Sequence, residues 1–218
     1  FPTHALPILV ADEAARTTFA KNIKTVLEKN KLDGIDLDFE WAENEKEYKD
    51  YSLAILKMRE VLGNKYLFSV SLHPVCYKIS KEAIEAVDFI SLQCYGPSPV
   101  RFPIEKYCSD IQMVLEYGIP KEKLVAGVPF YGVTKDNSKK TEAYFNFVQN
   151  GLVTSPAQNE VIYQGDTYVF DGQDNIRIKT RYAKEQKLKG MMSWDLATDL
   201  PLSDSRSLLK TMTEELRE

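Results

Sequence analysis

Three acidic side chains stand at alternate positions in the run DGIDLDFE: Asp36, Asp38 and Glu40. If this run forms a β-strand, residues two apart point to the same face, so the three carboxyl groups lie on one side of the strand. The positions between them carry apolar side chains, which suit a face packed beneath helices: Ile35, Leu37 and Phe39.

Carboxyl groups held a few ångströms apart cannot all ionise, so the row predicts a raised pKa for at least one of them. A carboxyl group that stays protonated near neutral pH can act as a general acid. We predict that role for Glu40, the last acid of the strand, with Asp38 and Asp36 sharing a proton or hydrogen bond behind it. An exposed polar strand face and a calcium loop are the other interpretations. The calcium loop needs glycine where Trp41 stands.

The hydrophobic pattern predicts that strands and helices alternate along most of the chain. Strands are predicted over residues 34–40, 66–72, 87–95, 124–131 and 190–195. Helices are predicted over residues 12–30, 44–62, 81–86, 104–117, 141–151, 175–188 and 203–216. The run VIYQGDTYVF predicts a β-hairpin that turns at Gly165 and Asp166.

Apolar strands that alternate with helices predict an α/β fold with a parallel sheet. No glycine-rich phosphate loop follows a strand, which favours a (β/α)8 TIM barrel over a nucleotide-binding open sheet. Only five barrel strands are found, so we expect an N-terminally incomplete barrel of about the last five βα units. It would be one domain over residues 1–218, with a small β-hairpin excursion before the last strand. Polar residues cluster at the strand ends, which share one rim in a barrel: Glu40, Gln93, Tyr95, Tyr131, Trp194 and Asp195.

The composition is that of a soluble globular protein, with 44% hydrophobic residues, 28% charged residues and a formal charge of −4. A net negative charge disfavours a nucleic-acid partner, and no apolar run is long enough to span a membrane. The N-terminal run FPTHALPILV lacks the basic and apolar regions of a signal peptide. The histidines, His4 and His73, and the three cysteines show no metal-ligand spacing. Buried free thiols are expected at Cys76 and Cys94, although a bridge between them stays open.

The run DGIDLDFE matches the DxxDxDxE signature of glycoside hydrolase family 18, the chitinases and related endo-N-acetylglucosaminidases. The segments QCYG (93–96), LVAGVPFYG (124–132) and GMMSWDLATD (190–199) look like the family's sixth, seventh and eighth strands. The resemblance runs in order from about Asp12 to the C-terminus. Gly96 departs from it, because the family often has Asp or Asn there, and the third-strand SxGG motif is not visible before Asp12.

The resemblance implies an eight-stranded barrel and a retaining, substrate-assisted hydrolysis of β-1,4 linkages next to N-acetylglucosamine, as in chitin or chitooligosaccharides. Glu40 would protonate the glycosidic oxygen, Asp38 would hold the substrate's acetamido N–H, and Asp36 would support Asp38. Tyr95 would hydrogen-bond the acetamido carbonyl, and Trp194 would form the floor under the sugar. No cofactor or metal is implied. The expected partner is an N-acetylglucosamine-containing oligo- or polysaccharide, and the protein is expected to be monomeric and secreted, or cell-surface or periplasmic.

Four further residues have a sugar-binding interpretation and a structural one. Gln93 contacts sugar or makes a structural hydrogen bond, and Tyr131 lines the groove or packs at the rim. Trp41 stacks on sugar or packs against the next loop, and Asp195 contacts sugar or caps a helix. His73 is expected to be structural.

Two other functions stay open at this point. One is an endo-β-N-acetylglucosaminidase that acts on glycoprotein N-glycans. The other is a chitinase-like lectin that binds sugar without cutting it. Lectins of this kind typically lose the terminal acid, which this chain retains as Glu40.

Overall fold

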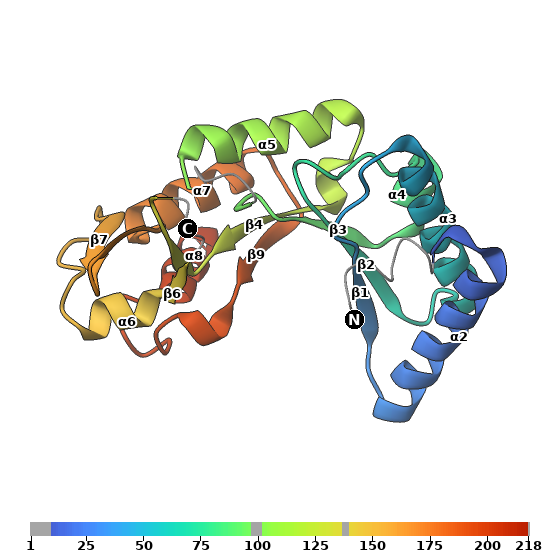
Figure 1. Ribbon diagram of the computed structural model, residues 1–218, viewed down its shortest axis with the longest axis horizontal. Coiled ribbons are helices and arrows are strands. Elements are labelled where there is room, and N and C mark those ends of the chain that lie inside the picture. The colour runs from blue at the N-terminus through green and yellow to red at the C-terminus, as the bar shows by residue number, and fades with distance from the viewer. Residues whose placement is uncertain (1–9, 97–101, 137–139, 218) are drawn as a thin grey trace. The chain divides into compact units, whose positions relative to one another are not determined.

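Strands and helices alternate through the residues that the computed structural model describes, which are 10–96, 102–136 and 140–217 (Figure 1). The chain divides into two compact units. The first unit contains Phe1–Leu92 and Val114–Leu124, and the second contains Gln93–Met113 and Val125–Glu218. Residues 1–9 of the N-terminal run, His4 among them, lie outside the described residues.

The first unit contains α-helices that alternate with parallel strands. Its elements are α2 (Glu13–Asn30), β1 (Gly34–Asp38), α3 (Glu45–Leu62), β2 (Leu67–Leu72), α4 (Lys81–Ala86), β3 (Phe89–Leu92), the last turn of α5 (Ile104–Tyr117) and η1 (Lys121–Lys123). Strand β2 pairs in parallel with both β1 and β3, and Asp36 lies opposite Ser69.

Polar caps set where the helices of the first unit begin. The side chain of Asp12 accepts a hydrogen bond from the Ala15 N–H at 2.8 Å, and the side-chain oxygen of Asn44 accepts one from the Glu47 N–H at 3.1 Å. Both residues were predicted as the first residue of a helix, and both are the N-cap instead, because their extended backbone frees the side chain to bond the first turn. Helices α4 and α5 begin and end at the predicted residues.

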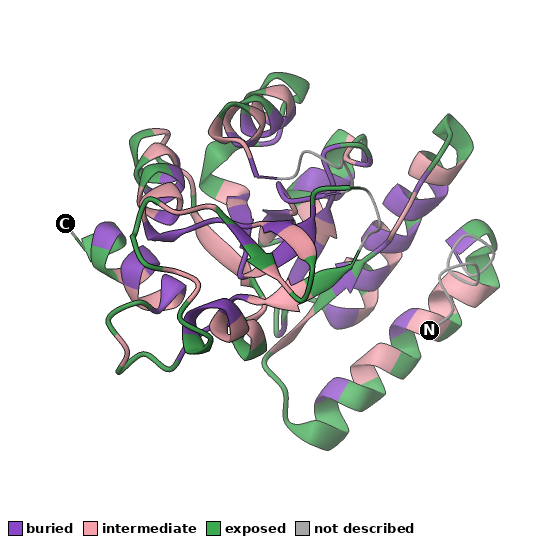
Figure 2. Ribbon diagram, turned by 60° about the vertical axis from the view of Figure 1, so that its left-hand side comes forward, coloured by how far each residue is buried: buried purple, intermediate pink, exposed green. Residues whose placement is uncertain are grey.

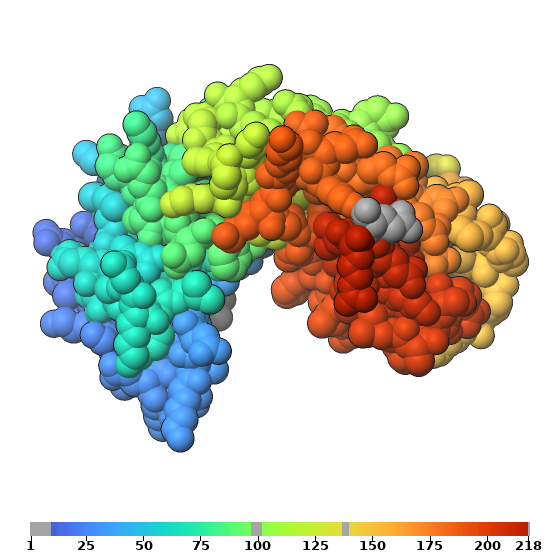
Figure 3. Space-filling view, turned by 180° about the vertical axis from the view of Figure 1, so that it is seen from behind, coloured from blue at the N-terminus to red at the C-terminus, as the bar shows by residue number. Residues whose placement is uncertain are grey.

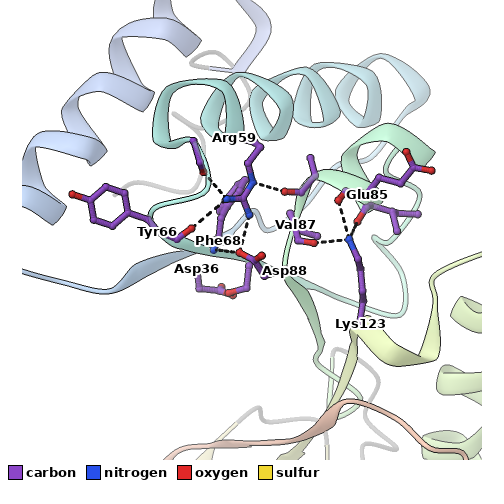
Figure 4. Close-up of polar contacts among 12 residues, drawn as sticks. Asp36, Arg59, Tyr66, Phe68, Glu85, Val87, Asp88 and Lys123 are labelled. Atoms are coloured by element: carbon purple, nitrogen blue, oxygen red, sulfur yellow. Dashed lines mark hydrogen bonds and ion pairs between the residues drawn. The ribbon is translucent and has the colours of Figure 1, made fainter.

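Two cationic side chains, Lys123 and Arg59, donate hydrogen bonds to the backbone carbonyl groups where α4 leads into β3 (Figure 4). The Lys123 ammonium donates to the carbonyls of Ile84, Glu85 and Val87 at 2.7–3.0 Å. The Arg59 guanidinium donates to the Ala86 carbonyl at 2.6 Å and to the Asp88 carboxylate at 2.7 Å. A helix end leaves carbonyl groups without partners, so these side chains fix the junction between α4 and β3.

The second unit holds a parallel pair and a separate antiparallel sheet. Its elements are most of α5, then β4 (Leu124–Pro129), β5 (Tyr131–Thr134), β6 (Thr141–Ala143), α6 (Tyr144–Gln149), β7 (Glu160–Tyr163), β8 (Asp166–Val169), α7 (Gln173–Glu185), β9 (Gly190–Trp194), η2 (Leu196–Thr198) and α8 (Leu208–Arg217). Strands β4 and β9 pair in parallel, with Pro129 opposite Trp194. The predicted α/β class with parallel strands is confirmed.

The predicted small hairpin is wrong in extent, because four antiparallel strands in the order β6-β5-β8-β7 form a sheet. The helix predicted over 141–151 begins only at Tyr144, since Thr141–Ala143 pairs with Tyr131–Val133. The strand predicted over 124–131 ends at Pro129, and Tyr131 opens β5 instead. These pairings join segments far apart in sequence, which periodicity within one segment does not predict.

The hairpin of β7 and β8 turns one residue earlier than predicted. Gln164 and Gly165 both have positive φ, 51° and 88°. A two-residue turn with positive φ at both positions matches the right-handed twist of the two strands it joins, so the turn falls at Gln164 and Gly165 rather than at Gly165 and Asp166.

The last helix, α8, begins five residues later than predicted. Asp199 accepts hydrogen bonds from the Ser207 hydroxyl at 2.8 Å and from the N–H groups of Leu208 and Leu209 at 3.0 and 2.9 Å. The Asp204 N–H donates to the Pro201 carbonyl, so the preceding residues form a turn. A carboxylate nine residues before Leu208 therefore sets where α8 starts.

Buried residues lie in most of the strands and on one side of the longer helices, while the opposite helix sides are exposed (Figure 2). The largest fully buried side chains of the first unit include Tyr51, Phe68 and Met58. In the second unit α8 lies against α7, as the dark red and orange surfaces show (Figure 3). Each unit thus has its own packed apolar interior.

Candidate active site

The predicted alternation of the acidic strand is confirmed. Leu37 and Phe39 are 7% and 2% exposed, whereas Asp36 and Asp38 are exposed. Strand β1 ends at Asp38, so Glu40 lies just beyond the strand's carboxyl end, where it is half-buried. The Tyr51 hydroxyl donates to the Leu37 carbonyl at 3.0 Å and its ring stacks on Phe39, which fixes the back of the strand. Burial, together with the charges of the nearby aspartates, raises the pKa of Tyr51 well above its usual value.

Two serines hold Asp36, and the sequence reasoning missed both. The Ser69 hydroxyl donates to Asp36 Oδ2 at 2.5 Å, and the Ser71 hydroxyl donates to Asp36 Oδ1 at 2.8 Å. Both come from β2, where they stand two apart and so point to the same face as the acids of β1. The alternating run FSVSL carried this signal, although only the strand register shows which acid the serines meet.

Glu40 contacts the residue that follows it. The Trp41 indole N–H lies 3.3 Å from Glu40 Oε2, and the Trp41 ring packs on the ring of buried His73, with 4.3 Å between ring centroids. Trp41 is half-buried. The packing of Trp41 against the next loop is therefore observed, and its sugar-stacking role stays a prediction. His73 is buried, and its structural role stays a prediction.

In the second unit, Tyr95 contacts Met192 through its hydroxyl and Tyr131 through its ring. Tyr95 is 6% exposed, and its hydroxyl lies 3.8 Å from the sulfur of Met192. The Tyr131 ring meets the rings of Tyr95 and Phe102 edge-on, at 6.4 and 6.5 Å between centroids. Tyr131 thus packs against Tyr95, for which the family resemblance implies the acetamido contact. The sugar contact of Tyr131 itself stays a prediction.

Trp194, at the end of β9, is 58% exposed, which is unusual for so large an apolar side chain. Asp195 follows it and makes no side-chain cap on η2, so the predicted capping alternative is not supported. One oxygen of Asp195, Oδ1, is buried without a hydrogen-bond partner. Gln93 is half-buried. The peptide bonds Glu40–Trp41 and Trp194–Asp195 are both cis.

The predicted site residues fall into two sets. The first unit carries Asp36, Asp38, Glu40 and Trp41, and the second carries Gln93, Tyr95, Tyr131, Trp194 and Asp195. The contacts above bring together members within each set.

The three cysteines are free, and Cys76 and Cys94 are buried, as predicted. Burial raises the pKa of Cys94 to about 12. Among the described residues, no group of three histidine, cysteine or acidic side chains is arranged to hold a metal ion. Within the same part of the chain, no helix has the length and apolar character needed to cross a membrane.

Comparison with curated proteins finds chitinases. "Probable chitinase 2" of Drosophila melanogaster is 24% identical over 255 residues, covering 88% of this chain and 52% of that protein. The chain therefore spans about half the length of this relative.

Solved structures have the same fold. The GH18 chitinase ChiB from the chitin utilization locus of Flavobacterium johnsoniae has a TM-score of 0.82 and 26% identity, over 98% of this chain and 70% of that one. The chitinase-like agglutinin RobpsCRA of Robinia pseudoacacia has a TM-score of 0.83 and 18% identity, over 98% of this chain and 76% of that one. The family model "Glycosyl hydrolases family 18" matches residues 4–199. Because that match covers most of its residues, this chain belongs to glycosyl hydrolases family 18.

Proposed function

We propose that the chain is the catalytic part of a chitinase-type glycosidase, which cleaves β-1,4 linkages next to N-acetylglucosamine with retention of configuration. The observation that carries this proposal is the ordered acid array: Asp36 and Asp38 project from one face of β1, and Glu40 follows at its carboxyl end. Family membership gives the array its chemistry. The (β/α)8 barrel, a single catalytic domain over residues 1–218 and a monomeric, secreted, cell-surface or periplasmic protein are parts of the same proposal.

In this mechanism the substrate supplies the nucleophile. The N-acetyl carbonyl oxygen attacks the anomeric carbon and the bond from that carbon to the glycosidic oxygen breaks, giving an oxazolinium ion. Glu40 donates its proton to the glycosidic oxygen, so the leaving sugar departs as an alcohol. Asp38 accepts a hydrogen bond from the acetamido N–H, and Asp36, fixed by two serine hydroxyls, supports Asp38. Glu40, now a carboxylate, removes a proton from a water molecule, which attacks the anomeric carbon and opens the oxazolinium ring.

The remaining candidate residues bind substrate in this proposal. Tyr95 donates from its hydroxyl to the acetamido carbonyl, and the exposed face of Trp194 stacks on the sugar. Tyr131, Gln93, Trp41 and Asp195 are proposed as further sugar contacts. The partner is an N-acetylglucosamine-containing oligo- or polysaccharide, and none of the proposed steps uses a cofactor.

The Glu40→Gln substitution tests the proposal. It removes the transferable proton and keeps the shape of the side chain, so kcat on a chromogenic chitooligosaccharide should fall by about 10²–10⁴-fold. Binding of N-acetylated chitooligosaccharides, measured by calorimetry, should persist. Glu43→Gln is the matched control, because Glu43 is exposed three residues further along the same segment. Equal turnover by wild type and Glu40→Gln would refute the assigned role.

A sugar-binding lectin is the second candidate, favoured by the likeness of fold to the Robinia agglutinin. Tight binding of chitooligosaccharides by the wild-type protein without any turnover would identify it. An endo-β-N-acetylglucosaminidase would instead release glycans from a high-mannose glycopeptide and leave chitin oligomers intact, which product analysis distinguishes.

A further inference from the structure

A tight turn after β2 lies against the segment that follows Glu40. The turn runs from His73 to Cys76 and is closed by two backbone hydrogen bonds, from the Cys76 N–H to the His73 carbonyl at 2.7 Å and from the His73 N–H to the Cys76 carbonyl at 3.3 Å. The side chains at its two ends are 5% and 2% exposed. A closed turn with buried ends has little freedom to move.

The first end of the turn fixes Trp41. The His73 ring packs on the Trp41 ring at 4.3 Å between centroids, and the Val75 N–H lies 3.4 Å from His73 Nδ1, which sets the orientation of the imidazole. On its other edge the indole N–H of Trp41 reaches Glu40 Oε2 at 3.3 Å. The orientation of the Glu40 carboxyl group is thereby linked to His73 through one aromatic ring.

The second end fixes the next residue, Ala42. Its buried backbone N–H donates to the Cys76 sulfur at 3.1 Å. A buried N–H without an acceptor is costly, so this contact determines the path of the backbone just after the acid. Tyr48 hydrogen-bonds the Cys76 thiol and lies 3.3 Å from the Val75 carbonyl, which ties the turn to α3. Burial raises the pKa of Cys76, so the sulfur is a neutral acceptor at neutral pH.

We propose that the His73–Cys76 turn is a positioning element for Glu40, which it orients through Trp41 at one end and Ala42 at the other. His73 and Cys76 touch no substrate in this proposal and act only through these two residues. The inference rests on the proposed role of Glu40 as the acid, and it adds a dependence of catalysis on a thiol and an imidazole that take no part in the chemistry.

Kinetics on the full chain test the proposal. His73→Ala removes the ring beneath Trp41, and Cys76→Ala removes the acceptor of the Ala42 N–H. Each should lower kcat on a chromogenic chitooligosaccharide by about 10-fold and leave KM within about two-fold, because small misplacements of a reacting group lower rates steeply. His73→Phe, which keeps a ring, and Cys76→Ser, which keeps an acceptor, should recover most of the lost kcat.

Two controls separate positioning from loss of stability and from loss of a thiol. Ile55→Val trims a fully buried side chain of α3 in the same unit and should lower the thermal midpoint without lowering kcat. Cys108→Ala removes a half-buried thiol on α5. A fall in kcat that tracks the thermal midpoint across all variants would overturn the proposal. So would His73→Phe and Cys76→Ser variants whose kcat is no higher than that of the alanine variants.

Fluorescence gives a readout that needs no turnover. The chain has two tryptophans, so Trp194→Phe leaves Trp41 as the single emitter. In that background Glu40→Gln should change the Trp41 emission while the turn is intact. The same change should be absent when His73→Ala is also present. Emission changes that are equal with and without His73 would overturn the positioning role. If the wild-type chain hydrolyses no chitooligosaccharide but the emission change still depends on His73, only the proposed function is overturned.

Discussion

At the scale of single residues, the first acid of the row is hydrogen-bonded by side chains of the neighbouring strand. Asp36 accepts from two hydroxyls of the neighbouring strand, at 2.5 and 2.8 Å. Because each oxygen has its own donor, the two hydrogen bonds fix the orientation of the Asp36 carboxyl group. Ser69 and Ser71 therefore set the direction in which Asp36 faces Asp38 in the proposed mechanism.

The double substitution Ser69→Ala and Ser71→Ala tests this support. Asp36 would lose both donors and turn toward water, so we expect kcat to fall by about 10-fold, or ~1.4 kcal/mol in activation free energy, with little change in KM. Steady-state hydrolysis of a chromogenic chitooligosaccharide measures the effect. Ser203→Ala, on an exposed turn, is the control. An unchanged kcat in the double variant would show that Asp36 needs no such support.

At the scale of elements, a short helix and a strand are joined by charged side chains. Asp88, just before β3, accepts from the Phe68 N–H at 2.7 Å and from Arg59 at 2.7 Å (Figure 4). Burial alone would raise the pKa of Asp88, but these two donors outweigh it and hold the pKa below its usual value. The junction between α4 and β3 is thus more stable while Asp88 carries its charge.

This depressed pKa predicts a pH-dependent stability. A carboxyl group whose pKa is lower in the folded state stabilises the fold above its unfolded pKa of about 3.9, and the contribution is lost as the pH falls through the folded value. Asp88→Asn should therefore lower the unfolding free energy at pH 7, by about 1 kcal/mol because the pair is partly exposed, and by much less near pH 2. Urea unfolding of both proteins at the two pH values measures the difference. An equal loss at both would contradict the prediction.

At the scale of the whole molecule, a buried ion pair lies inside the packed interior of the second unit. In the second unit, Lys179 and Asp171 form an ion pair at 2.5 Å with side chains 2% and 0% exposed. Asn175 donates to the other oxygen of Asp171 at 3.1 Å, and the Lys179 ammonium lies 5.5 Å from the centre of the Tyr107 ring. The pair connects the segment after β8 to α7.

Breaking this pair should be costly because it leaves an uncompensated buried charge. Lys179→Met is expected to lower the unfolding free energy by about 3–5 kcal/mol, and adding Asp171→Asn should restore part of the loss. Denaturant unfolding of the single and double variants measures both values. Lys189→Met, at an exposed position of the same unit, should change stability by less than about 0.5 kcal/mol. A double variant less stable than Lys179→Met would contradict the buried-charge explanation.

Local patterns in the sequence were enough to predict most of the helices and strands and the alternation of the acid row. Helices α4 and α5 have the predicted bounds, and Leu37 and Phe39 are buried on the face opposite the acids, because periodicity and caps act within a few residues along the chain. The family also followed from sequence alone, since the signature lies within eight consecutive residues.

The tertiary structure decided what depends on partners distant in sequence. Residues 141–143 form a strand because Tyr131–Val133 lies beside them, and α8 starts at Leu208 because Asp199 reaches its first N–H groups. The surroundings of Glu40 likewise depend on residues distant in sequence. The sequence by itself determined that an acid stands at this position, whereas only the packing of the His73–Cys76 turn against Trp41 and Ala42 shows how its carboxyl group is held, because those contacts join residues more than thirty positions apart.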